Sequence, residues 1–155
     1  MMTHLTSDVL QALEGKTLAT AESCTGGMIG QMLTAVPGSS AVYKGGIISY
    51  TNEIKRNLLG VDETLLETEG AVSAPVARAM AEGARKVLNA DVAVSVTGLA
   101  GPSGDDRGNP VGLVYIGYAD EKGTEVLSCL FEGDRDEIRT QAAETALALI
   151  LSQNK

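Results

Sequence analysis

The feature that most constrains the fold is a nearly continuous apolar run, Val-Ala-Val-Ser-Val, between Asp91 and Thr97. Such a run is typical of a strand that is buried on both faces, because each face then needs apolar side chains. Segments with helical spacing alternate with strand-like segments along the chain, and an apolar hairpin follows them. This order predicts a three-layer α/β/α domain built on a mixed sheet.

Capping and turn residues mark the ends of the other elements. Helices are predicted over residues 5–13, 28–33, 53–59, 62–69 and 73–89 and from residue 134 onward, and strands over 17–21, 41–50, 91–97, 113–119 and 124–131. Asn52 and Ser73 have the side chains of helix N-caps, and Gly45-Gly46 predicts a bulge or a close backbone approach within its strand. Residues 98–112 form the one long irregular segment, and loops of that length usually carry function.

Length and charge narrow the classes of function. The 155 residues suit a single domain over 1–155, and the formal net charge of −8 argues against nucleic acid or an anionic membrane as the main partner. A few arginines and backbone N–H groups can still hold one small anion, because salt screens distant charge. The N-terminal residues lack the pattern of a signal peptide, and no segment has membrane-spanning length. We therefore expect a cytoplasmic protein with reduced thiols.

The histidine and cysteine content argues against several mechanisms. His4 is the only histidine and lies near the N-terminus, so a Ser-His-Asp or Cys-His mechanism is not expected. Cys24 and Cys129 form no C-x-x-C pair, and neither a metal nor another cofactor is predicted. A nucleophile in this chain would need a lysine, a tyrosine or a carboxylate as its base.

Ser23 is the candidate nucleophile, because it lies on the turn between a predicted strand and a predicted helix. Tyr50 ends the next strand, and Lys55 lies in the first turn of the helix that follows, so both belong at the same edge of the sheet. Burial would lower the pKa of the lysine, and a neutral amine can accept the serine proton. The local pattern also allows Ser23 to be a helix cap and Cys24 to be a rival nucleophile.

The helix start at Gly26-Gly27 is a second candidate element of the site. Free N–H groups at such a start would suit an oxyanion or a phosphate. The neighbouring Glu22 either orients Lys55 or caps the backbone, and the sequence leaves both interpretations open.

A set of short motifs occurs in order along nearly the whole chain. They are Ala21-Glu22-Ser23-Cys24-Thr25-Gly26-Gly27, Pro37-Gly38-Ser39-Ser40, Gly45-Gly46-Ile47-Ile48-Ser49-Tyr50-Thr51-Asn52-Glu53, Lys55, Leu59-Gly60-Val61, Gly70-Ala71-Val72-Ser73, Thr97-Gly98-Leu99-Ala100-Gly101-Pro102, Pro110-Val111-Gly112, Gly133-Asp134-Arg135 and Arg139. Together these motifs closely resemble the C-terminal domain of the CinA family.

Members of that family that consist of this domain alone resemble nicotinamide-nucleotide amidohydrolases (PncC). The resemblance implies that nicotinamide mononucleotide and water give nicotinate mononucleotide and ammonia, without a metal or cofactor. It also implies a serine nucleophile with tyrosine and lysine partners, at Ser23, Tyr50 and Lys55. Contacts to the phosphate and ribose of the substrate are assigned to Thr25, Gly26, Gly27, Thr97, Gly98, Gly101 and Arg139. The role of Arg135 stays open, because it could simply belong to a helix start.

Two alternatives to this activity stay open on the sequence. The domain could bind a nucleotide or a protein partner without catalysis, or it could be an amidase for another carboxamide. The small size and the apolar hairpin strands also lead us to expect a homo-oligomer.

Overall fold

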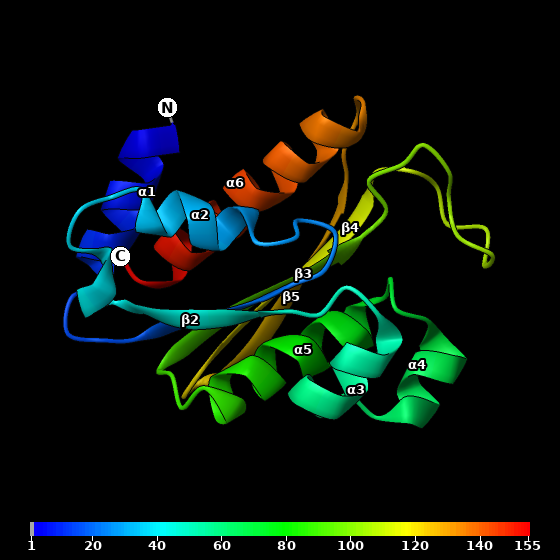
Figure 1. The fold of residues 1–155 in the computed structure, drawn as a ribbon, viewed down its shortest axis with the longest axis horizontal. Coiled ribbons are helices and arrows are strands. Elements are labelled where there is room, and N and C mark those ends of the chain that lie inside the picture. Colours follow the sequence, from blue (N-terminus) through cyan, green and yellow to red (C-terminus); the bar gives the residue numbers. More distant parts are fainter. Residues whose placement is uncertain (1) are drawn as a thin grey trace.

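A five-stranded mixed sheet lies between two layers of helices in the computed structural model, which describes residues 2–155 (Figure 1). In the spatial order β2-β1-β3-β4-β5, the strands are β1 (Leu18–Glu22), β2 (Tyr43–Ile48), β3 (Val92–Gly98), β4 (Leu113–Asp120) and β5 (Gly123–Leu130). The helices are α1 (Met2–Ala12), α2 (Met28–Thr34), α3 (Asn52–Leu59), α4 (Glu63–Glu69), α5 (Ala74–Val87) and α6 (Arg135–Gln153), with a 3-10 turn η1 (Ser39–Ala41). The predicted three-layer α/β/α fold is confirmed.

The topology of the sheet brings three chain segments to one edge. Strand β1 runs parallel to both β2 and β3, whereas β4 and β5 extend the sheet in antiparallel fashion. Helices α1, α2 and α6 cover one face, and α3, α4 and α5 cover the other (Figure 1). Because β1, β2 and β3 are parallel, the chain leaves all three at the same edge. The turn after β1, the segment after β2 and the loop 99–112 therefore meet there.

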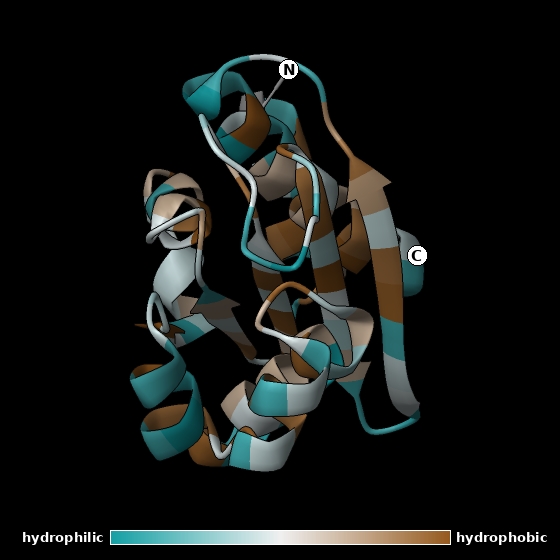
Figure 2. Ribbon diagram, turned by 90° about the vertical axis from the view of Figure 1, so that its right-hand side faces the viewer, coloured by the Kyte–Doolittle hydropathy of each residue, from teal (hydrophilic) through white to brown (hydrophobic). Residues whose placement is uncertain are grey.

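Strand β3 explains why the apolar run is continuous. Its three valines pack in the core cluster that also holds residues of α1, α2 and α6, whereas Ala93 packs in the cluster beside α5. Ser95 Oγ donates to the carbonyl of Ala77 in α5 at 2.6 Å, so the one polar residue of the run is paired inside the core. In Figure 2 the strands are mostly hydrophobic, and the helices alternate between hydrophobic and hydrophilic residues. None of the helices in the described residues is long and apolar enough to cross a membrane.

Strand β2 has an irregular register directly before its glycine pair and approaches β1 closely at Gly46. Leu18 of β1 pairs with Tyr43, but the next residue, Ala19, pairs with Gly45, so Lys44 is the extra residue. A Cβ atom on Gly46 would lie 2.1 Å from Thr20 Oγ1, which leaves no room for a side chain there. The glycines thus allow β2 to lie close against β1 despite the irregular register.

The helix caps agree with the sequence at α5 and differ at α3. Ser73 caps α5 as predicted, with its side chain accepting from the N–H of Val76. The prediction of Asn52 as the cap of α3 is wrong, because Thr51 has the extended backbone of an N-cap and its Oγ1 accepts from the N–H of Ile54 at 3.3 Å. Adjacent residues that can both cap a helix are not separated by local sequence preference alone.

Candidate active site

Ser23 and Lys55 are in direct contact at the edge where the parallel strands end. Lys55 Nζ lies 3.1 Å from Ser23 Oγ and donates to it, and it also donates to the carbonyl of Ser49 at 2.8 Å. The two residues are buried, with 8% of Ser23 and 2% of Lys55 exposed. The hydroxyl of Ser23 is thus paired with Lys55, one of the two residues that the sequence placed at this edge as its possible partners.

Local structure explains how a lysine of α3 reaches this serine. The N–H of Ser23 donates to the carbonyl of Val96 at 3.0 Å, which extends the pairing of β1 with β3 by one residue. The N–H of Ser49 donates to the carbonyl of Glu22 at 2.7 Å, so the end of β2 is fixed beside the nucleophile. Helix α3 begins directly afterwards, and Lys55 in its first turn points back to the sheet edge.

Burial shifts the pKa values of Lys55 and Cys24, the two reactive groups next to Ser23, in opposite directions. It lowers the pKa of Lys55 from 10.5 to about 8, because the charged amine loses its hydration. About one tenth of this lysine is then neutral at pH 7 and able to accept a proton. Burial raises the pKa of Cys24 to about 11 despite the nearby charges of Arg139, Lys55 and Arg135. The thiol is therefore protonated at neutral pH, which disfavours Cys24 as the nucleophile.

A cavity of about 300 Å³ lies over the Ser23–Lys55 pair. Its lining comes from the turn after β1, the segment from the end of β2 into α3, the segment before α5, the end of β3 with the loop that follows, and the start of α6. The residues are Ser23, Cys24, Tyr50, Asn52, Lys55, Ala71, Val72, Thr97, Gly98, Leu99, Ala100, Gly101, Ser103 and Arg135. Tyr50 is 59% exposed, and its hydroxyl accepts from Nη2 of Arg135 at 3.2 Å. Among the described residues no hydrogen bond joins Tyr50 to Ser23 or Lys55, so the tyrosine shares the cavity without touching the pair.

Three of the predicted binding residues, Thr97, Gly98 and Gly101, also line this cavity. Thr97 Oγ1 donates to the carbonyl of Ala71 at 2.7 Å, which ties the end of β3 to the segment before α5. A Cβ atom on Gly98 would lie 2.8 Å from the carbonyl oxygen of Leu113. Glycine is thus required there for the close pairing of β3 with β4.

The other four predicted binding residues, Thr25, Gly26, Gly27 and Arg139, lie outside the cavity lining. The expectation of free N–H groups at the start of α2 is wrong, because the buried carboxylate of Glu22 accepts from three of them. The donors are Gly27 at 3.2 Å, Ile29 at 3.0 Å and Gly30 at 3.1 Å. Of the two interpretations of Glu22, the structure shows the backbone cap.

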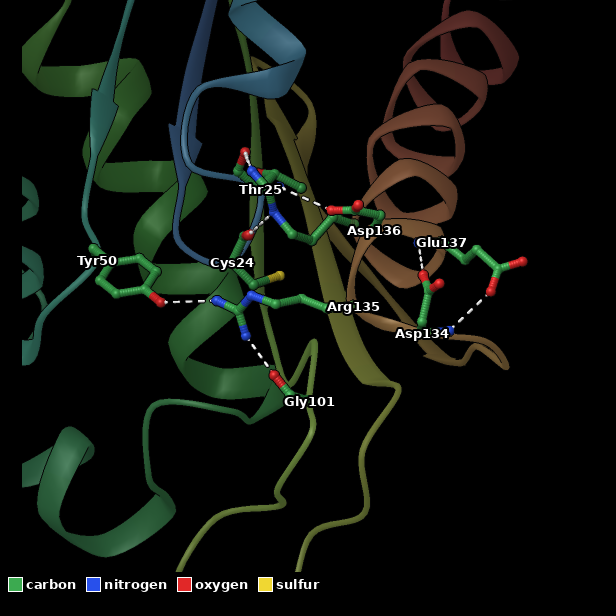
Figure 3. A network of polar contacts seen from close by, with 9 residues as sticks. Cys24, Thr25, Tyr50, Gly101, Asp134, Arg135, Asp136 and Glu137 are labelled. Carbon is green, nitrogen blue, oxygen red and sulfur yellow. Dashed lines mark hydrogen bonds and ion pairs between the residues drawn. The ribbon is translucent and has the colours of Figure 1, made fainter.

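Two arginines one turn apart on α6 reach the site in different ways, and Figure 3 shows the first of them, Arg135, between Tyr50 and Gly101. Arg135 bridges the cavity, since it donates to the carbonyl of Gly101 as well as to the hydroxyl of Tyr50. Arg139 instead donates to the carbonyls of Cys24 and Thr25. Of the two arginines, only Arg139 was predicted from the sequence to belong to the site. Their i, i+4 spacing places both on one face of the helix, and this was the available signal for Arg135.

Comparisons with known proteins identify the family of the chain. A family model described as the CinA C-terminal domain matches residues 2–153. The chain belongs to this family. A CinA-like protein of Geobacter sulfurreducens is 55% identical over 134 residues, which are 86% of this chain and 32% of that protein. A CinA-like protein of Sulfurihydrogenibium is 51% identical over 135 residues, 87% of this chain and 34% of that protein. The chain thus spans about a third of the length of these relatives.

Solved structures of the CinA superfamily have the same fold. The competence/damage inducible protein CihA of Agrobacterium tumefaciens is 39% identical, with a TM-score of 0.95 over 99% of this chain and 96% of that one. A CinA superfamily protein of Escherichia coli is 34% identical, with a TM-score of 0.96 over 99% of this chain and 90% of that one. The names of these two proteins refer to competence and damage and specify no reaction.

Proposed function

We propose that this CinA-type domain is a serine amidohydrolase that converts nicotinamide mononucleotide and water into nicotinate mononucleotide and ammonia. The observation that carries the proposal is the 3.1 Å contact between Ser23 Oγ and Nζ of Lys55. A buried lysine with a lowered pKa costs folding free energy, and such groups concentrate at sites of acid–base chemistry. The substrate itself is inferred from the family resemblance.

In the proposed mechanism Lys55 is the base for Ser23. The neutral amine takes the proton of Ser23 Oγ while the oxygen forms a bond to the carboxamide carbon. The tetrahedral intermediate then collapses and breaks the C–N bond, and the ammonium of Lys55 gives its proton to the leaving nitrogen, which departs as ammonia. Water next attacks the ester, with Lys55 taking its proton, and the serine hydroxyl is restored as nicotinate mononucleotide leaves.

The remaining groups of the cavity have proposed roles in holding the substrate. Arg135 is the cation that we place against the phosphate, because its guanidinium lines the cavity and an arginine binds phosphate through paired N–H groups. Thr97, Gly98 and Gly101 also line the cavity and would contact the ribose. Tyr50 would orient the carboxamide or relay the serine proton, and its hydroxyl would exchange its bond with Arg135 for one to the substrate.

Of the other two candidate functions, the binding module explains less of this geometry, and the amidase for another carboxamide differs only in its substrate. A module that only binds a nucleotide has no need of a base in contact with a buried hydroxyl. An amidase for another carboxamide would use the same pair, Ser23 and Lys55, but it would not prefer nicotinamide mononucleotide over simpler amides. Substrate comparison therefore separates these possibilities.

The test is release of ammonia from nicotinamide mononucleotide, nicotinamide riboside and free nicotinamide by the purified chain. We expect activity with the mononucleotide, and a loss of at least about a thousandfold in both Ser23→Ala and Lys55→Ala. Activity that prefers a carboxamide without the nucleotide would contradict the substrate. Full activity in Ser23→Ala would contradict the mechanism, and absence of ammonia from every substrate would favour the binding module.

A further inference from the structure

The turn that follows Ser23 is fastened to a helix from the far end of the chain. Arg139 of α6 donates through Nε to the carbonyl of Cys24 at 2.9 Å and through Nη2 to the carbonyl of Thr25 at 3.1 Å. These contacts span more than a hundred residues of sequence, and the side chain of Arg139 is only 28% exposed. The planar guanidinium thus holds two consecutive peptide groups at once.

The same contacts leave Arg139 little capacity for a ligand. Its third nitrogen, Nη1, lies 3.9 Å from Oδ1 of Asp136, which is 92% exposed. All three guanidinium nitrogens therefore face groups of the protein, and Arg139 is absent from the cavity lining. A role in binding the substrate phosphate would require Arg139 to release the turn.

The hydrogen bonds within the turn fix its conformation only in part, so bonds from outside the turn complete it. Gly26 and Gly27 have φ angles of 57° and 106°, a region that glycine enters readily but does not prefer over others. Inside the turn, the described bond is that from the N–H of Gly26 to the carbonyl of Ser23 at 3.1 Å. The carbonyl of Cys24 has Arg139 as its partner among the described residues, whereas the carbonyl of Thr25 also accepts from Met28 at 3.0 Å.

A buried hydroxyl in the turn favours opening. Thr25 is fully buried, and its Oγ1 has no hydrogen-bond partner among the residues that the structure describes. Such a group is stabilised by water when the segment that covers it moves away. The closed turn, in which Ser23 Oγ lies beside Lys55, is thus held against this tendency by the bonds from outside, and Arg139 supplies two of them.

We propose that Arg139 is a positioning residue for the hydrolysis: it holds the peptide groups after Ser23 so that Ser23 Oγ stays within reach of Lys55. This inference rests on the proposed function for its kinetic consequences, but the clamp itself concerns the reactivity of Ser23. Displacement of a nucleophile by about 1 Å can cost a hundredfold in rate. Loss of the clamp should therefore reduce kcat and leave substrate binding nearly intact.

The experiment compares Arg139→Ala and Arg139→Lys with a matched control, Arg85→Ala. Arg85 also donates to a backbone carbonyl, that of Asp91 at 3.0 Å, but at the opposite end of the sheet. We expect kcat for nicotinamide mononucleotide to fall by about a hundredfold in Arg139→Ala, with KM changed by less than about threefold. Arg139→Lys should recover part of the loss, and added guanidinium or ethylguanidinium should partly rescue Arg139→Ala. The control should keep the wild-type kcat.

A second measurement tests the role of Arg139 without depending on which substrate the protein hydrolyses. The rate at which a serine-directed fluorophosphonate modifies Ser23, followed by intact mass, should fall in Arg139→Ala and not in Arg85→Ala. This result would support the clamp even if nicotinamide mononucleotide were not hydrolysed. A raised KM with unchanged kcat would overturn the inference in favour of a substrate contact. A lowered melting temperature with unchanged kcat and labelling would leave Arg139 a purely structural role, and a wild-type chain inert in both assays would overturn the clamp and the proposed function together.

Discussion

Two loops meet at the same edge of the sheet, and the protein holds them in different ways. The turn after Ser23 is short and buried, and it is fixed by β3, by the carboxylate of Glu22 and by Arg139. The loop 99–112 lies mostly at the surface and is fastened by side chains at separate points. Arg107 donates to the carbonyls of Glu67 and Thr68 at the end of α4, and Arg135 donates to the carbonyl of Gly101.

This difference indicates a division of labour at the proposed site. A proton transfer needs its atoms held to within a fraction of an ångström, so the Ser23 turn is packed into the core. Contacts to the distant parts of a substrate tolerate more movement, and loops on a rigid scaffold usually supply them. Changes in the turn should therefore act on kcat, whereas changes in the loop and its anchors should act on KM.

The largest effect is expected from the base beside the turn. Lys55→Met keeps most of the side-chain volume and removes the amine that contacts Ser23 Oγ. We expect kcat/KM to fall by roughly 10³–10⁴-fold while the circular dichroism spectrum stays that of the wild type. Lys44→Met is the matched control, because Lys44 donates to a backbone carbonyl, that of Asn89, at 3.1 Å and lies away from the cavity. Residual activity within tenfold of the wild type would show that Lys55 is not the base.

The second effect is the pH dependence of the proposed hydrolysis, which follows from the pKa of Lys55. The pKa of Lys55 is lowered by burial to about 8, and the neutral amine is the active form. Activity should therefore rise with pH, with kcat/KM increasing about tenfold per pH unit below 8 and reaching a plateau above it. Between pH 6 and pH 9 the increase should be about a hundredfold. An alternative mechanism through Cys24, whose pKa is about 11, would continue to rise beyond pH 9.

The sequence predicted the parts of this arrangement that follow from chain direction. Parallel strands and short connections bring Ser23, Tyr50 and Lys55 to one edge whatever the details of packing, and β1, β2 and β3 are parallel. The contact of Ser23 with Lys55 then follows from the place of the lysine in the first turn of α3. The absence of further histidines had already limited the choice of base.

The parts that could not be predicted depend on side chains that meet across layers. Arg139 reaches residues more than a hundred positions away, and no local pattern distinguishes its backbone contacts from the cavity position of Arg135. Glu22 had two chemically reasonable partners, and the packing of α2 against β1 decides for the backbone N–H groups. Sequence spacing identifies a face of a helix, but the depth at which each side chain ends is set by tertiary packing.

The third effect tests Arg135, which holds the loop at Gly101 and also lines the cavity over Ser23. Arg135→Gln removes the charge that lines the cavity and keeps a polar side chain in its place. We expect KM for nicotinamide mononucleotide to rise by tenfold or more, since a charge-assisted bond is worth about 1.5–3 kcal/mol, with kcat changed by less than about threefold. Nicotinamide riboside has no phosphate, so its KM should be equal in the two proteins. An equal rise for both substrates would place Arg135 elsewhere than at the phosphate.

The smallest effect is expected from Arg107, which joins the exposed part of the loop 99–112 to α4. Arg107 is exposed and donates to two carbonyls at the C-terminal end of α4, where the helix dipole favours a cation. Such exposed contacts contribute about 0.3–1 kcal/mol, so Arg107→Gln should raise KM by no more than about fivefold and leave kcat unchanged.

Limited proteolysis should cut the loop 99–112 faster in the variant, because the anchored state is less populated. Faster cleavage together with unchanged kcat would support a loop that binds and a turn that reacts. A fall in kcat of tenfold or more would show instead that the chemistry depends on the loop, and the division between the two regions would not hold.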